Sequence, residues 1–116
     1  MGEGTTNPSV LDLAQLEDAT GGEAELIQEL SELYLMDVAA QFGDLSEAVG
    51  SRNLEHVYRI AHGLKGSSAS IGAAEAAGAF RALEMLGRQG ASAGLGEALC
   101  AAKEAVDRVR SALAEL

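Results

Sequence analysis

The sequence NLEHVYRIAHGLKGSSASI occupies residues 53–71, and its apolar side chains recur at the spacing of an α-helix. Asn53 is a good N-cap residue, because its side-chain oxygen can accept a hydrogen bond from a backbone N–H of the first turn. With about 100° of rotation per residue, the apolar side chains gather on one face. The spacing therefore predicts a helix from Asn53 to about Ser70. Its expected core residues are Val57, Ile60, Leu64, Ser68 and Ile71.

Helical spacing also extends along the chain on both sides of this segment. Residues 10–18 form a short amphipathic opening, and Thr20-Gly21-Gly22-Glu23 matches a capping box at the start of a long helix. That helix reaches about Val49, and Gly43 is the position where it could bend. Two more helices are expected, from about Ala74 to Leu86 and at the C-terminal end. The expected core residues of these three helices are Leu26, Leu30, Leu33 or Tyr34, Val38, Leu45 and Val49; Ala76, Ala79, Phe80, Leu83 and Leu86; and Leu99, Ala102, Val106, Val109, Leu113 and Leu116.

Composition favours helices as well. Hydrophobic residues make up 47% of the 116 residues, but aromatic residues only 3%, so alanine and leucine carry the core. This length is typical of one domain with one hydrophobic core. Four helices with short connections and one apolar stripe each predict an all-α fold, an antiparallel four-helix bundle with a short N-terminal helix. We expect it to span residues 10–116 as a single domain, after a flexible leader at residues 1–9.

Charge and cysteine content exclude several classes of function. The net charge of −10 argues against binding the phosphate backbone of a nucleic acid. Cys100 is the single cysteine, which excludes a disulfide framework, and we expect it to lie partly buried beside the last apolar stripe. No signal peptide and no membrane-spanning run is recognisable, so we expect a cytoplasmic protein. Residues 1–50 hold eleven acids and no Lys or Arg, which directs the search for an anion-handling site to the second half.

His62 faces away from the predicted core, at the middle of the outer face of its helix. Gly63 and Gly66 beside it are unusual, because an exposed helix face normally carries Glu, Lys, Gln and Arg. Each glycine within a helix costs about 0.5–1 kcal/mol relative to alanine. Because Gly66 faces away from the core, close packing of a neighbouring helix explains it less well than the approach of another protein. The residues within about 60° of His62 are Glu55, Tyr58, Arg59, Lys65, Gly66 and Ala69.

Lys65 follows His62 by three residues, so its ammonium can reach an anion carried on the ring. A neighbouring cation also favours the neutral imidazole, which is the nucleophilic form. An exposed ring, a cation and an open approach suit the reversible capture of a phosphoryl group. His56 lies about 120° from His62, at the edge of the core. We expect His56 to be a surface residue and expect no metal site shared by the two histidines.

Residues 61–73, AHGLKGSSASIGA, resemble the signature of histidine-containing phosphotransfer (HPt) domains. That signature has a histidine, two residues, a lysine, a glycine, two small residues and a glycine-alanine helix end. The resemblance covers nearly the whole chain from about Val10, and it implies a stand-alone four-helix bundle that relays phosphoryl groups between receiver-domain aspartates. It extends to Asn53, where the family usually has Asp, to the Tyr34-Leu35 pair and to the Leu83-Glu84 pair.

The resemblance also implies roles for individual residues. His62 is the phosphorylated residue, and Lys65 and Arg88 support the phosphate. Whether the second cation is Arg59, Arg81 or Arg88 stays open at this point. The residues expected to dock the receiver are Tyr58, Arg59, Gly66 and Ala69.

A partner receiver domain is expected to supply the acceptor aspartate and its Mg²⁺, because the sequence has no phosphate-binding loop of the Walker type. The chain itself is then a phosphotransfer intermediate with no cofactor, no metal and no kinase activity of its own. The resemblance implies a monomer that receives the phosphoryl group from a hybrid sensor histidine kinase and donates it to a response regulator. We expect neither nucleic acid nor membrane as a partner.

Two other functions remain open on sequence grounds. The first is a chemotaxis-kinase-like domain that an ATP-binding kinase domain phosphorylates directly. The second is a helical adaptor that binds a partner without being phosphorylated. The presence of both His62 and Lys65 counts against the adaptor, since binding alone requires neither.

Overall fold

A computed structural model describes residues 7–116 of the protein. Within that range the chain folds into five helices and no strand, which confirms the prediction of an all-α fold. Residues 1–6 of the expected leader lie outside the described residues. The helices are α1 (Leu13–Thr20), α2 (Ala24–Gly50), α3 (Leu54–Ser70), α4 (Ala74–Gln89) and α5 (Leu95–Ala114).

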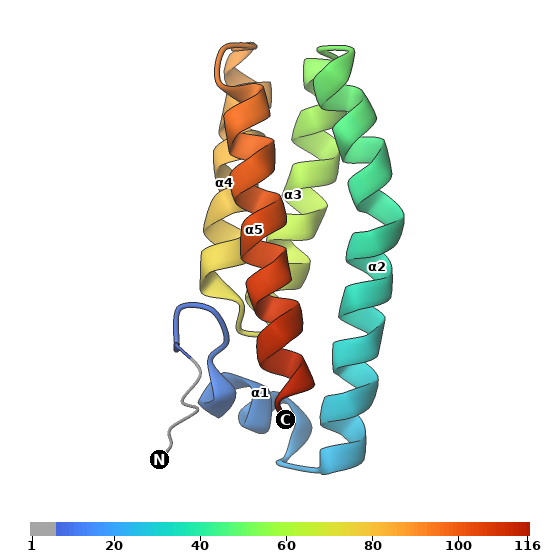
Figure 1. Cartoon of the computed structure of the whole chain (residues 1–116), viewed down its shortest axis with the longest axis vertical. Helices are drawn as coiled ribbons and strands as arrows, with labels where there is room; N and C mark the ends of the chain where they lie inside the picture. The colour runs from blue at the N-terminus through green and yellow to red at the C-terminus, as the bar shows by residue number, and fades with distance from the viewer. Residues whose placement is uncertain (1–6) are drawn as a thin grey trace.

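The four long helices lie side by side along the longest axis of the molecule, and each runs opposite to the one before it (Figure 1). α3 packs against α2 and α4, and α5 packs against α4 and α2, so the four helices surround one core. The short helix α1 lies across the end where α5 finishes. All five expected core residues of α3 are buried, and so are Phe80, Leu83, Val106 and Val109 from the last two helices.

Helix ends agree with the sequence in one case and differ in another. Asn53 is the N-cap of α3, and its side chain accepts a hydrogen bond from the His56 N–H at 3.2 Å, as predicted. The prediction of a capping box at Thr20 was wrong. Thr20 is the last residue of α1, where its hydroxyl donates to the Leu16 carbonyl, and Glu23 is the N-cap of α2 without a side-chain hydrogen bond. Gly21 ends α1 in the left-handed conformation, so α1 and α2 are two helices with a tight turn between them.

Some expected core positions are in fact exposed. Leu26 is 41% exposed, because the inward face of α2 is rotated away from it toward Tyr34 and Val38. Of the alternatives Leu33 and Tyr34, Tyr34 is the buried one and Leu33 is 59% exposed. Leu116, also expected in the core, is 56% exposed. Cys100, expected to be partly buried, is exposed. Gly43 lies inside α2 without interrupting it. No helix among residues 7–116 has the length and apolar character needed to cross a membrane.

The segment before α1 is attached to the turn between α3 and α4. The Ser9 carbonyl accepts a hydrogen bond from the Glu75 N–H at 2.7 Å, and the Asp12 N–H donates to the Gly72 carbonyl at 2.8 Å. The Gln15 side chain donates to the Ala69 carbonyl at 2.7 Å. These bonds satisfy backbone groups at the end of α3 and in the first turn of α4, and they join the segment before α1 to the turn between those two helices.

Candidate functional site

His62 lies on the outer face of α3, beside a groove between α3 and α4. Its side chain is 60% exposed. Val57 and Leu64, on the opposite face of the same helix, are fully buried. The ring is therefore held on a rigid helix with its outer edge accessible. The groove is lined by Tyr58, His62, Lys65, Gly66, Ala69, Arg81, Glu84, Met85, Arg88 and Gln89.

Gly87 sets the distance between the two walls of this groove. A methyl group on Gly87 would lie 2.7 Å from the Leu54 carbonyl oxygen and 2.8 Å from the Tyr58 nitrogen, which is too close for any side chain. α3 and α4 therefore approach each other backbone to backbone at this point. This approach brings the preceding turn of α4, which carries Glu84, within reach of His62 and Lys65.

Glu84 joins the two residues that the sequence singled out. Its Oε2 lies 2.5 Å from His62 Nδ1, and its Oε1 accepts a hydrogen bond from Lys65 Nζ at 2.7 Å. From the sequence, the Lys65 ammonium was expected to be the charged neighbour of the ring. The charged group in contact with the ring is instead the Glu84 carboxylate. Lys65 is one-third exposed, and its charge is paired inside the protein.

The Glu84 carboxylate is ionised in this arrangement. It is only 7% exposed, but the hydrogen bond from Lys65, followed by that from His62, lowers the pKa of Glu84 below its usual range. An ionised carboxylate can only accept hydrogen bonds, so Nδ1 must carry the hydrogen. In the neutral ring the lone pair then belongs to Nε2. Among residues 7–116, Nε2 has no hydrogen-bond partner.

His62 is flanked by an aromatic side chain and by two glycines with open space around them. Tyr58, one turn before it, stacks on the ring with centroids 5.9 Å apart and planes 18° from parallel. A methyl group on Gly63 or Gly66 would meet no atom within 4 Å. Packing inside the described part of the chain therefore does not explain either glycine. The Ser67 and Ser70 hydroxyls donate to the carbonyls of these two glycines, at 3.2 and 3.0 Å.

The three candidate second cations occupy different places. Arg81 and Arg88 of α4 line the groove, and neither forms an ion pair with a carboxylate of residues 7–116. Arg59 does not line it, and its guanidinium pairs with Glu55 at 3.3 Å. The structure thus brings Lys65, Arg81 and Arg88 together around His62 and leaves Arg59 outside.

A buried hydrogen bond fixes the rotation of α3 on the side opposite His62. The Tyr34 and Ser68 hydroxyls lie 2.8 Å apart and both residues are buried. Burial raises the pKa of Tyr34, so the phenol stays protonated and can donate. Rotating α3 about its axis would break this bond, and the bond therefore helps to keep His62 outward.

Glu84 contacts both His62 and Lys65, but the sequence interpretation assigned it no role. The family resemblance extends to the Leu83-Glu84 pair, but it implies no role for the acid. A signal was present: Ala76, Phe80 and Gly87 share one face of α4 with Glu84, at spacings of three and four residues. A lone carboxylate on a face otherwise made of apolar and small residues requires a partner from a neighbouring helix.

Residues 7–116 contain no group of three or more His, Cys, Asp and Glu side chains that could hold a metal ion. His56 is exposed on the first turn of α3, as expected, and it does not line the His62 groove.

The sequence matches a known protein family. The family model of the Hpt domain matches residues 12–112, nearly the whole chain. Neither the search of curated proteins nor the search of solved structures returned a match. Because the matched region contains the His62 motif together with the first four helices and most of α5, the chain belongs to the Hpt domain family, whose members act in histidine phosphotransfer and two-component signalling.

Proposed function

We propose that this chain is a phosphorelay intermediate, built as an antiparallel four-helix bundle with a short N-terminal helix, in which His62 carries the phosphoryl group. His62 accepts it from the receiver aspartate of a hybrid sensor kinase and passes it to the aspartate of a response regulator. Hpt domains are phosphotransfer modules and not kinases. The observation that carries the proposal is the contact between His62 Nδ1 and Glu84, which leaves the lone pair of the neutral ring on Nε2.

In the receiving step, the lone pair of His62 Nε2 forms a bond to phosphorus while the bond between phosphorus and the aspartate oxygen of the receiver breaks. The aspartate leaves as a carboxylate, and the ring gains a positive charge that it shares with Nδ1–H. Glu84 accepts the Nδ1 hydrogen bond and stabilises this charge. The donating step reverses these events, since the next aspartate attacks phosphorus and the ring recovers its lone pair.

Phosphoryl transfer also requires charge neutralisation around the equatorial oxygens. We assign this role to Lys65 and Arg88, with Arg81 as a third cation on the same groove. Lys65 has a second part, because its ammonium balances the charge of Glu84 when the ring is neutral. The receiver supplies the acceptor aspartate and the Mg²⁺ that its own acidic site binds.

The receiver docks over His62 on the open side of α3. Gly66 and Ala69 leave room for an approaching surface, and Tyr58 supplies an aromatic contact next to the ring. Arg59 lies outside the groove, so its part in docking is limited to the rim of the contact. The exposed Met85 of α4 adds an apolar contact on the other wall.

The test is incubation of the full chain with a phosphorylated receiver domain. We expect an acid-labile, base-stable phosphate on the chain and a matching loss from the receiver. His62→Gln should abolish the label, whereas His56→Gln, on the same helix, should keep it. Label on the His62→Gln variant, or no label on the natural chain, would overturn the proposal.

The same assay separates the other two functions. Phosphate that arrives from ATP and a kinase core, with no receiver present, would identify a chemotaxis-kinase-like domain. Receiver binding and signalling that both survive His62→Ala and Lys65→Ala would identify an adaptor that is not phosphorylated.

A further inference from the structure

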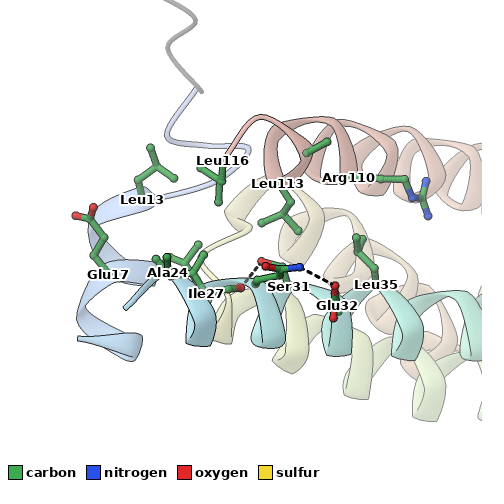
Figure 2. Close-up of a pocket in the computed structure, with 13 residues that line it drawn as sticks. Leu13, Glu17, Ala24, Ile27, Ser31, Glu32, Leu35, Arg110, Leu113 and Leu116 are labelled. Carbon is green, nitrogen blue, oxygen red and sulfur yellow. Dashed lines mark hydrogen bonds between the residues drawn. The ribbon is translucent and has the colours of Figure 1, made fainter. Parts of the chain in front are cut away.

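A second groove lies between α1, α2 and the end of α5, away from His62. Figure 2 shows Leu113 and Leu116 facing Ile27 across it, with Leu13 at its edge. Its volume is about 520 Å³, which is within the range of protein binding pockets. Leu13 and Leu116 remain 39% and 56% exposed at its mouth, although they belong to an otherwise apolar wall. The groove thus offers apolar surface that no part of residues 7–116 covers.

The floor of this groove has little free hydrogen-bonding capacity. Ser31 is buried there, and its hydroxyl already donates to the Ile27 carbonyl at 2.7 Å. The Gln28 side chain donates to Glu32 at 3.3 Å. An occupant therefore gains stability mainly from apolar burial.

The walls of the groove are negatively charged. Residues 1–50, which include α1 and α2, contain no Lys or Arg, and Glu17 and Glu32 line the groove. Arg110 is the one cation among the lining residues, and Asp107 pairs with it at 2.8 Å. An apolar floor with an acidic rim selects an occupant that is apolar on one side and cationic on the other.

A second copy of this chain does not meet that requirement. α2 carries six carboxylates and no Lys or Arg, so bringing two such faces together would be opposed by repulsion. The Lys and Arg residues lie on α3, α4 and α5 and on the turn before α3, and the apolar stripes of these helices are buried in the core. These charges favour an occupant from another protein.

We propose that this groove binds a basic amphipathic helix of a partner protein, with apolar side chains at i, i+3, i+4 and i+7 and Lys or Arg on both flanks. The groove shares no lining residue with the one beside His62. The amphipathic helix would therefore leave free the groove beside His62, over which the receiver is proposed to dock. The proposal does not depend on phosphotransfer.

The test uses a synthetic amphipathic helix with Leu on one face and Lys on its flanks, added to the ¹⁵N-labelled full chain. We expect saturable binding, with amide shift changes concentrated around the groove, that weakens as salt is raised. Leu13→Ser combined with Leu116→Ser should weaken binding by about tenfold, because apolar contact is lost at both edges. Since both side chains are partly exposed, this variant is expected to fold.

Matched variants keep the result specific. Leu33→Ser combined with Met36→Ser removes side chains that are 59% and 69% exposed on α2 but do not line the groove, and this change should leave binding unchanged. Glu17→Gln with Glu32→Gln should weaken binding several-fold more than Glu29→Gln with Asp44→Asn, although the change in net charge is equal.

Three outcomes would overturn the proposal. The first is equal binding by groove and control variants, and the second is equal binding of a peptide in which Glu replaces Lys. The third is concentration-dependent dimerisation of the chain through this face in sedimentation experiments, which would make a second copy the occupant.

Discussion

The Glu84 carboxylate lies 2.5 Å from Nδ1 of His62, although the two residues are on different helices and 22 positions apart. This distance depends on the close approach of α3 and α4 at Gly87 and on the pairing of the other carboxylate oxygen with Lys65. The His62 ring is therefore exposed, but its tautomer is determined by the nearly buried Glu84 carboxylate.

Replacing Glu84 by Ala should slow phosphoryl transfer to and from His62 by about 10- to 100-fold, because the ring loses the partner that fixes its tautomer and stabilises its charge. The transfer rate of Glu84→Gln should lie between those of the natural chain and Glu84→Ala, since the amide oxygen can still accept a hydrogen bond from Nδ1–H. Transfer rates with a phosphorylated receiver check this, and Glu55→Gln, an exposed change on α3, is the control.

A structural role alone would not move the tautomer. In the natural chain, ¹⁵N spectra of the neutral His62 ring should show hydrogen on Nδ1, and in Glu84→Ala the Nε2–H form should become populated. Unchanged spectra together with a slower rate would mean that Glu84 acts only through folding.

Glu84 should also make stability depend on acid pH. Hydrogen bonds from Lys65 and then His62 lower the pKa of Glu84 in the folded chain, so its contribution to stability is complete above the ordinary pKa of Glu in the unfolded chain. That contribution is lost as pH falls through the folded value. We expect the free energy of unfolding of the natural chain to exceed that of Glu84→Gln by about 1 kcal/mol at pH 7. This difference should shrink below about pH 4. Urea unfolding at several pH values measures it, and a constant difference would contradict the assignment.

The helices and the outward position of His62 could be predicted from the sequence because both follow from local periodicity. Asn53, Val57 and Leu64 fix the start and the inner face of α3 without reference to any other helix. Gly66 was also correctly expected to have no packing partner, because its place on the outer face is a local property.

The features that could not be predicted from the sequence depend on how neighbouring helices pack against each other. The contact of Glu84 with His62 follows from a backbone approach at Gly87, and no local pattern encodes which turn of α3 lies opposite. For a similar reason Leu26 of α2 was wrongly expected in the core, and the choice between Leu33 and Tyr34 stayed open. Leu33 and Tyr34 are adjacent and both apolar enough for a core, and the bond from Tyr34 to Ser68 favours the aromatic residue.

Gly87→Ala should destabilise the fold by about 1–3 kcal/mol, because the new methyl group would collide with the backbone of α3. The helices would separate and carry Glu84 away from His62, so transfer should slow as well. Gly78→Ala on the same helix is the control. Its methyl group meets no atom within 4 Å, and it should stabilise by about 0.5–1 kcal/mol. Equal thermal stability of the two variants would contradict the close approach.

The buried pair of hydroxyls should be separable by a double-mutant cycle. Tyr34→Phe leaves Ser68 without its partner and should cost about 1 kcal/mol in the free energy of unfolding, whereas Tyr34→Phe with Ser68→Ala should cost less than the sum of the single changes. Burial raises the pKa of Tyr34, so the folded chain keeps a proton that the unfolded chain loses. Stability of the natural chain should therefore fall as pH rises above about 10, and part of that fall should disappear in Tyr34→Phe. Additive costs in the cycle would mean that the two hydroxyls do not interact.

Gly66 should show opposite effects on stability and on transfer. In Gly66→Ala the new methyl group would contact no atom within 4 Å, and alanine is favoured over glycine within a helix. The free energy of unfolding should therefore rise by about 0.5–1 kcal/mol. Gly66→Leu should keep the fold but obstruct a docking receiver, and transfer to His62 should slow at least about tenfold. Gly96→Leu is the matched control, since Gly96 is an exposed helical glycine on α5 that does not line the His62 groove. Fast transfer by a stable Gly66→Leu variant would show that the receiver does not approach over this side of α3.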